Sequence, residues 1–455
     1  TVPTTTPEST TTPTVPTTTP VPTTTPTVPT TTPGPTTTPT VGTTTPTPTT
    51  TPTVPTTTPQ PTTTPTIQPR TVPPTVPTAA PKPPNTPSKI CSIDNCKPPN
   101  CTCMSTKPPG GLDVKDMPQF VMLSFDDAVT QVNMPFYREL LAGLKRKNKA
   151  SGCAIAATFF VSGEYLDYPS VNELYTGGNE IALHSISHKS SPVYWNGLDT
   201  AGWESEVVHQ RLMVEKYANV PAADIKGLRG PFFFTGSDAG FRMLHRHFDY
   251  DCTLIHQRDS PASAPVYPYT LDFGFQKNCV VKECPKDAYP GLWSMPLNML
   301  LRGKEMGGFD VYRQCAMADA CAPDPLTADD TFHYLKANFE NFYSLNRAPL
   351  PVFLHEAWLK DTERKKGYLR FVDWLLEKED VYLVTVSEVL DFMRNPRPKA
   401  SYAQRRCLKD QPKSTCPQIK SCRYEKTPPG GERHMRICGT TCPPMYPWVG
   451  NPNGN

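Results

Sequence analysis

The sequence predicts an α/β fold, with a parallel sheet or barrel, that follows a Thr/Pro-rich stalk and is framed by cysteine-rich segments. Two observations carry this prediction. Between residues 119 and 395, short apolar segments alternate with amphipathic ones, which is the pattern of repeated βα units. Residues 1–88 are almost entirely Thr, Pro and Val. The 455 residues therefore hold one large globular domain with low-complexity sequence before it.

The stalk, residues 1–88, repeats variations on PTTTP and carries only Glu8, Arg70 and Lys82 as charged side chains. Such a segment has too little apolar surface to offset its conformational entropy, and its prolines favour extended polyproline II. The composition is typical of mucin-like, O-glycosylated stalks, with a bare disordered linker as the alternative. In either case we expect no catalytic role for it.

Cysteine usage predicts an oxidising, extracellular environment. All 15 cysteines lie outside the stalk, with clusters at residues 91–103 and 407–442. We expect disulfides in both clusters. Zinc sites are the weaker alternative, because the cysteine spacings do not match known zinc-binding motifs. The odd total leaves one thiol unpaired or bonded to another chain. The chain begins inside a repeat, so we expect a signal segment to have been removed or to lie outside this sequence.

The charge and hydropathy of the chain argue against two classes of partner. The net charge of +3 is too small to indicate nucleic-acid binding. No apolar run approaches the about 18 residues that a membrane span needs. We therefore expect a secreted protein that does not bind nucleic acid and does not span a membrane.

Regular elements are expected on both sides of an irregular segment. The expected strands and extended segments are Val121–Phe125, Ala157–Val161, Glu180–Leu183, Ile225–Arg229, Tyr250–Leu254, Pro351–His355 and Val381–Thr385. The expected helices are Pro135–Lys147, Trp203–Tyr217, Ser237–His247, Asp329–Tyr343, Thr362–Glu377 and Ser387–Arg394, the last with Ser387 as N-cap. Residues 257–325 are expected to be an irregular insertion held by local disulfides among Cys279, Cys284, Cys315 and Cys321.

Polar side chains follow four of these strands. Asp126 and Asp127 end the first, His184 begins the HSISH segment that ends at His188, and Arg229 and His355 end two others. Because the carboxyl ends of parallel strands share one rim of a sheet or barrel, we expect these side chains to converge.

The converging residue types have a chemical sense. Asp127, His184 and His188 form a His-His-carboxylate set suited to Zn²⁺ or another divalent ion, with positions left open for water and substrate. Asp126 is then available as a base toward a water that the ion acidifies. Arg229 could orient Asp126, and a protonated His355 could donate to a leaving nitrogen.

In order, the motifs SFDDAV, HSISH, RGPFF and FLHEAW resemble those of the polysaccharide deacetylase family (NodB homology, carbohydrate esterase family 4), and especially those of animal chitin deacetylases. The resemblance covers about residues 120–395 and implies a distorted (β/α) barrel. With the composition and the cysteine positions, it sets the expected domain limits: 1–88 for the stalk, 89–118 for a cysteine-rich lead-in, 119–395 for the deacetylase domain and 396–455 for a cysteine-rich C-terminal segment.

The resemblance also implies residue roles. Asp126 corresponds to the catalytic base and His355 to the catalytic acid. Arg229 corresponds to the partner of the base, and Asp127, His184 and His188 to the metal ligands. The backbone N–H of Phe232 would bind the oxyanion. The carboxylate that orients the acid histidine in the family has no clear match, and Asp251 is a candidate.

These features predict metal-dependent deacetylation of N-acetylglucosamine polymers, chitin above all, with release of acetate. An inactive chitin-binding or mucin-like extracellular matrix protein is the alternative, but the base and the metal set are both present. If the protein were a purely structural mucin, the occurrence of all four motifs in the family order would be a coincidence. A glycosidase would not need the HxxxH at a strand end.

Overall fold

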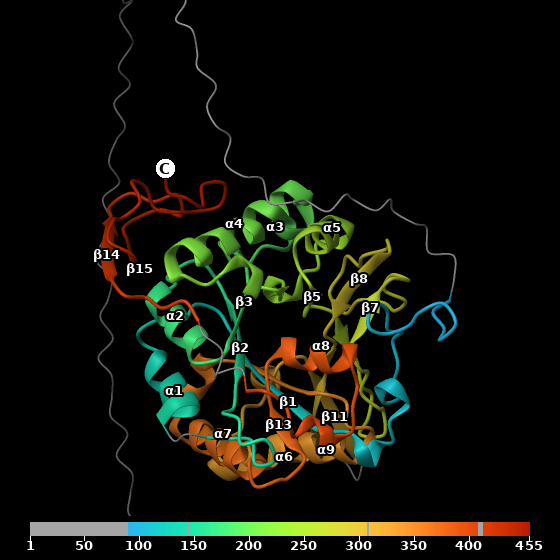
Figure 1. The fold of residues 1–455 in the computed structure, drawn as a ribbon. Coiled ribbons are helices and arrows are strands. Elements are labelled where there is room, and N and C mark those ends of the chain that lie inside the picture. Colours follow the sequence, from blue (N-terminus) through green and yellow to red (C-terminus); the bar gives the residue numbers. More distant parts are fainter. Residues whose placement is uncertain (1–89, 144–145, 307–308, 408–412) are drawn as a thin grey trace, which may run out of the picture. The chain divides into compact units, whose positions relative to one another are not determined.

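The computed structural model describes residues 90–143, 146–306, 309–407 and 413–455 (Figure 1). The predicted stalk over 1–88 lies outside the described residues, so its extended character stays a prediction.

A largely parallel sheet forms the centre of the described chain. Strand β1 (Gln119–Asp126) pairs in parallel with β12 (Leu350–His355), β2 (Ala157–Val161) and β13 (Val381–Leu383). The sheet continues from β2 through β3 (Glu180–Leu183), β4 (Gly227–Leu228), β5 (Tyr250–Asp251), β8 (Tyr289–Ser294) and the antiparallel β7 (Tyr269–Leu271). The α/β prediction is confirmed. Within the described ranges, the strand order runs from β12 to β7 without closing into a ring.

Helices cover this sheet. They are α1 (Met134–Arg138), α2 (Tyr168–Thr176), α3 (Pro192–Gly197), α4 (Thr200–Ala218), α5 (Ser237–His247), α6 (Ala328–Leu345), α7 (Thr362–Leu375), α8 (Val386–Arg394) and α9 (Lys399–Tyr402). Every residue of β1, β2 and β3 is buried, as expected for parallel strands that are covered on both faces. Helix α7 packs on α6, and α4 packs on α2 and α5 (Figure 1). No described helix has the length and apolarity that a bilayer crossing requires.

Two predicted helix ends were wrong. The helix expected over Pro135–Lys147 is α-helical only to Arg138 and continues as a π-helical turn over Glu139–Gly143. The N-cap of α8 is Thr385 rather than Ser387. Thr385 Oγ1 accepts from the Glu388 N–H at 3.2 Å, and Glu388 Oε2 accepts from the Thr385 N–H at 3.1 Å, which completes a capping box. The Ser387 hydroxyl donates to Glu180 instead.

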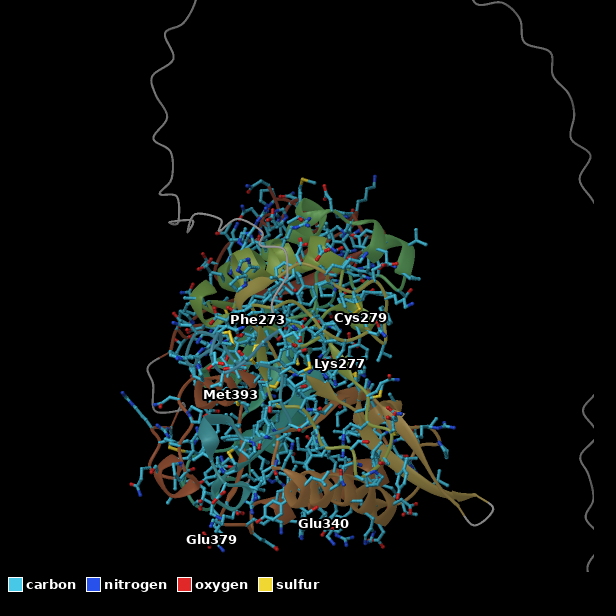
Figure 2. The ribbon with its side chains drawn as sticks, turned by 90° about the vertical axis from the view of Figure 1, so that its right-hand side faces the viewer. Phe273, Lys277, Cys279, Glu340, Glu379 and Met393 are labelled. Atoms are coloured by element: carbon cyan, nitrogen blue, oxygen red, sulfur yellow. A yellow bond between two sulfur atoms is a disulfide. The ribbon has the colours of Figure 1, made fainter. Side chains whose placement is uncertain are left out.

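The expectation that residues 257–325 are irregular was also wrong. Strands β7 and β8 of this segment join the main sheet, and β9 (Leu297–Asn298) pairs with β6 (Ile255–His256). Strands β10 (Leu300–Met306) and β11 (Phe309–Cys315) form a hairpin. Pro290 and Gly291 lie inside β8 and weaken its local strand signal. The segment is seen in Figure 2, where Phe273, Lys277 and Cys279 are labelled.

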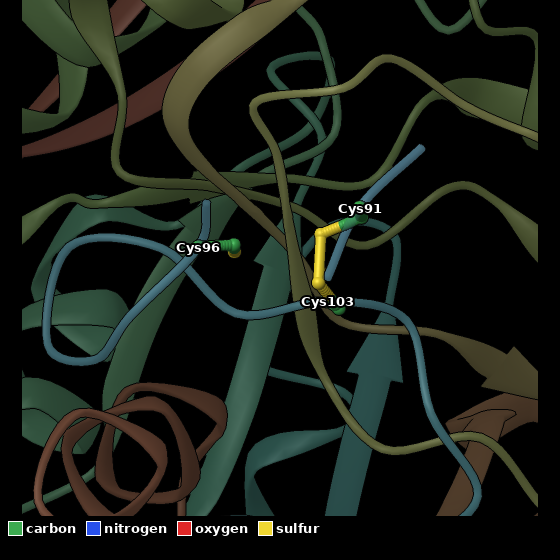
Figure 3. Close-up of side chains that lie close together, drawn as sticks. All are labelled: Cys91, Cys96 and Cys103. Carbon is green, nitrogen blue, oxygen red and sulfur yellow. A yellow bond between two sulfur atoms is a disulfide. The ribbon is translucent and has the colours of Figure 1, made fainter. Parts of the chain in front are cut away.

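Seven disulfides confirm that the two cysteine clusters form disulfides, and both expected local bridges of the insertion are present. They are Cys91–Cys103, Cys96–Cys101, Cys153–Cys407, Cys279–Cys284, Cys315–Cys321, Cys416–Cys438 and Cys422–Cys442. The sulfurs of Cys91, Cys96 and Cys103 lie close together, but each belongs to a disulfide, which leaves no thiolate for zinc (Figure 3). Cys252 is the one unpaired cysteine of the described chain, and it is buried.

A two-stranded hairpin near the C-terminus, β14 (Ile419–Tyr424) and β15 (Arg433–Cys438), carries two of these bridges. Strand β15 packs against α2 and α4, so this cysteine-rich end is part of the same folded body (Figure 1).

Candidate active site

The predicted convergence of strand ends is observed. Asp126 ends β1 and is paired in register with His355, which ends β12. His184 follows β3, and Arg229 follows β4, the strand beside it in the sheet. Neighbouring parallel strands therefore bring these side chains to one rim.

Three side chains at this rim form a potential metal cluster. One donor atom from each of Asp127, His184 and His188 lies within 4.8 Å of the other two. The two histidine Nε2 atoms are 3.2 Å apart, and Asp127 Oδ1 is 3.5 Å from His188 Nε2. His184 Nδ1 donates to the carbonyl oxygen of Arg229 at 2.6 Å, so the lone pair of His184 is on Nε2, toward the cluster. Burial lowers the pKa of His184 to about 3, which keeps its ring neutral. This donor set fits a divalent ion.

The backbone of the cluster is conformationally unusual. Asp127, Ser185 and His188 have φ angles of 76°, 73° and 44°, in the left-handed region that non-glycine residues rarely adopt. Each such residue costs about 1–3 kcal/mol and persists only when its surroundings enforce it. The histidine loop, residues 184–188, therefore needs a source of support.

Glu206 of α4 supplies that support. Its side chain is buried, and Oε2 accepts from the backbone N–H groups of Ile186 and Ser187 at 3.2 and 2.9 Å. Oε1 accepts from the Ser187 and Tyr194 hydroxyls, each at 2.5 Å. Three hydrogen bonds from Ile186 and Ser187 thus hold the loop that carries both histidines, and the fourth joins Glu206 to Tyr194 of α3. Sequence reasoning did not identify Glu206, because a glutamate inside a predicted helix carries no local signal of such a role.

Asp126 is held by a buried arginine. Arg229 Nη1 donates to Asp126 Oδ1 and, at 3.1 Å, to Ser124 Oγ. The guanidinium lies between the rings of Phe160 and Phe353, at 4.0 and 4.1 Å from their centroids. Asp126 Oδ2 faces His184 Nε2 at 3.8 Å. Burial raises the pKa of Asp126, and the charge of Arg229 opposes the rise. The carboxylate thus has one oxygen directed to the metal cluster and a raised affinity for protons.

His355 lies beside the cluster, at the end of β12. Its Nδ1 donates to Asp319 Oδ2 at 2.7 Å, and its Nε2 is 3.9 Å from Asp127 Oδ2. Burial lowers the pKa of His355, but the hydrogen bond to Asp319 and the charges of Asp126, Asp319 and Asp127 outweigh it and raise that pKa to about 9. The ring is therefore protonated at neutral pH.

Asp319, not the candidate Asp251, is the carboxylate partner of His355. Asp251 is buried at the end of β5, where Oδ2 accepts from the Leu254 N–H at 3.3 Å. Asp319 lies in the short 3₁₀ helix η6 (Ala318–Ala320), enclosed by the Cys315–Cys321 bridge. The only sequence signal for it was that pair of closely spaced cysteines.

Phe232 lies beside the cluster. It belongs to the 3₁₀ turn η5 (Pro231–Phe233), has a φ of 50°, and its ring centroid is 4.8 Å from that of His188. The first hydrogen bond within this turn runs from the Phe233 N–H to the Gly230 carbonyl oxygen at 3.0 Å. The Phe232 N–H lies one residue earlier, so it has no acceptor within the turn. Its role toward an oxyanion stays a prediction.

Residues 113–233 match the family model described as polysaccharide deacetylase. The chain is 37% identical over 375 residues to chitin deacetylase 8 of Bombyx mori, an alignment that covers 80% of this chain and 93% of that protein. It is 33% identical over 380 residues to chitin deacetylase 1 of Bombyx mori, with 80% and 68% covered. A solved polysaccharide deacetylase from Bacillus cereus is 13% identical, with 59% of this chain and 91% of that chain covered and a TM-score of 0.32.

Proposed function

The chain belongs to the polysaccharide deacetylase family, whose members are hydrolases that act on carbon–nitrogen bonds. We propose that it removes acetyl groups from N-acetylglucosamine polymers, chitin above all. The observation that carries the proposal is that Asp126 and His355 each lie next to a different member of the cluster of Asp127, His184 and His188. Asp126 Oδ2 is 3.8 Å from His184 Nε2, and His355 Nε2 is 3.9 Å from Asp127 Oδ2. The names of the two Bombyx mori relatives support chitin as the substrate.

The cluster would hold one divalent ion, with Zn²⁺ as the first candidate, because two imidazole nitrogens and a carboxylate suit zinc and leave positions open. When bound, such an ion polarises a carbonyl and lowers the pKa of a coordinated water.

The residues around the cluster then divide the proton transfers of amide hydrolysis. The oxygen of the attacking water bonds to the acetyl carbon, and Asp126 accepts a proton from that water. Asp126 does so through Oδ2, the oxygen that Arg229 does not contact. His355 donates its Nε2 proton to the nitrogen as the carbon–nitrogen bond breaks. The Phe232 N–H stabilises the negative charge on the carbonyl oxygen. The products are acetate and a free amine on the sugar.

Acetate release from N-acetylglucosamine oligomers tests the proposal. Purified protein should release acetate and free amines in equal amounts, should lose this activity in a chelator, and should regain it with added Zn²⁺. A parent chain that binds chitin and retains its metal but releases no acetate from any N-acetylated glycan would favour the alternative of an inactive chitin-binding protein.

The setting of the enzyme is part of the proposal. Seven disulfides support a secreted, extracellular protein. We assign catalysis to residues 119–395 and propose that residues 1–88 are a mucin-like stalk. Deleting the stalk should leave turnover of soluble oligomers unchanged, and a large loss would contradict this division.

A further inference from the structure

The loop after β2 lies directly beside the histidine loop. The Gly163 N–H donates to the Ser185 carbonyl oxygen at 2.9 Å, and the Glu164 N–H donates to that of Ile186 at 3.2 Å. Ser185 and Ile186 lie between His184 and His188 in the chain. Tyr165 is the next residue of this loop, one position beyond the backbone that bonds to the histidine loop.

Tyr165 is presented in a way that core packing does not explain. It is 59% exposed, although most aromatic residues near it are buried, and its φ is 62°. A bulky side chain in the left-handed region carries a conformational cost. An exposed aromatic ring on a strained backbone, close to a catalytic rim, is better accounted for by a ligand than by stability.

The C-terminal hairpin holds this ring in place. The guanidinium of Arg433, on β15, lies 5.1 Å from the Tyr165 ring centroid, and its Nη2 contacts Glu164 Oε1 at 2.8 Å. Arg436, also on β15, pairs with Asp167 at 3.0 Å, at the other end of the loop. Two disulfides, Cys416–Cys438 and Cys422–Cys442, tie the hairpin together. The guanidinium packs near the ring, and much of the remaining ring surface is open to a ligand.

We propose that Tyr165, backed by Arg433, is a stacking subsite for a pyranose ring of the glycan chain, next to the sugar that is deacetylated. The inference rests on the proposed function, because it takes an N-acetylglucosamine polymer as the ligand. The apolar C–H face of a pyranose packs on an aromatic ring, and the phenol hydroxyl can meet a sugar hydroxyl. On this reading the cysteine-rich C-terminal segment contributes to recognition of a polymer.

Binding to full-length protein carrying Asp126→Asn separates affinity from turnover. Calorimetry with the N-acetylglucosamine dimer and hexamer should show that Tyr165→Ala weakens hexamer binding by about 3- to 10-fold and dimer binding less. Tyr165→Phe should retain most of the affinity. Arg433→Ala should weaken hexamer binding in the same direction, because it releases the ring. Ile419→Ala is the matched control, since it removes a side chain that is 51% exposed on the same hairpin and should leave hexamer affinity unchanged.

The outcomes distinguish this subsite from the proposed function. Equal hexamer affinity for Tyr165→Ala and its parent, or equal losses for dimer and hexamer, would overturn the subsite even if the wild-type chain deacetylates chitin. Chain-length-dependent binding through Tyr165 in a protein that releases no acetate would uphold the subsite and reject the activity. A parent that binds no N-acetylglucosamine oligomer would overturn both.

Discussion

A single oxygen of Asp319 accepts two hydrogen bonds from His355, one from ring Nδ1 at 2.7 Å and one from the backbone N–H at 2.8 Å. The pair fixes the orientation of the ring and holds a proton on Nδ1, which leaves Nε2 directed toward the cluster. The disulfide Cys315–Cys321 closes the short loop that carries Asp319. The position of the proposed catalytic acid thus depends on a segment outside the recognisable motifs.

Replacing Asp319 by Asn should lower both the rate and the upper pH limit of activity. His355 donates only when protonated, so activity falls as pH rises through its pKa, which the carboxylates raise to about 9. Removing the Asp319 charge lowers that pKa, and the alkaline limb of the pH profile should move to lower pH. We expect kcat to fall by about 10- to 100-fold, part of the typical contribution of general acid catalysis.

Asp324→Asn is the matched control for this change, because Asp324 lies close by in the chain but pairs with Arg364. A pH–rate profile of Asp319→Asn with an unmoved alkaline limb would contradict the assignment of His355 as the acid.

The sequence predicts the residues at the strand ends better than the residues that hold them in position. Strands β2 and β3 have their predicted bounds, because each is short, mostly apolar and buried along its whole length. The residues at their ends could be found because strand ends share a rim. Asp319 and Glu206 could not, since their roles arise from tertiary contacts between segments 36 and about 20 residues apart in the chain. The cap at Thr385 was missed by two residues because Ser387 is an equally good capping type.

Glu206→Gln should weaken metal binding more than it weakens the fold. An amide can accept through only one of its two side-chain atoms, so it cannot serve the Ile186 and Ser187 N–H groups together with the Ser187 and Tyr194 hydroxyls. The histidine loop would relax from its left-handed geometry. Residues that orient metal ligands are typically worth about 10- to 100-fold in metal affinity. Titration of metal-free protein with Zn²⁺ measures the effect.

Glu215→Gln is the matched control for Glu206→Gln, because Glu215 lies on the same helix. It accepts a hydrogen bond from the Ala222 N–H at 3.2 Å, and Ala222 is far from the histidine loop in the sequence. Equal Zn²⁺ affinities for both variants would show that Glu206 does not position the ligands.

The disulfide Cys153–Cys407 should stabilise the fold more than Cys96–Cys101 does. It joins residues 254 apart in the chain, whereas Cys96–Cys101 joins residues 5 apart. A cross-link over a longer loop removes more conformational entropy from the unfolded chain, and losing a native bridge typically costs about 2–5 kcal/mol. Thermal unfolding of the Cys153→Ala/Cys407→Ala and Cys96→Ala/Cys101→Ala double variants should give the lower Tm for the first. The reverse order would show that native-state contacts, not loop length, set the contribution of each bridge.

Asp126→Asn and Asp127→Asn should fail in different ways although the residues are adjacent. Arg229 holds Asp126, whose Oδ2 faces His184 Nε2 at 3.8 Å, whereas Asp127 belongs to the donor cluster. Asn keeps the shape of Asp126 but cannot accept a proton from water, so kcat should fall by about 10²- to 10⁴-fold with metal content unchanged. Asp127→Asn should instead lower metal affinity, and excess Zn²⁺ should restore part of its activity. Metal analysis and acetate release on both variants separate the two effects. If the Asp126→Asn enzyme kept its metal and deacetylated oligomers as fast as the parent, the assignment of Asp126 as the general base would be wrong.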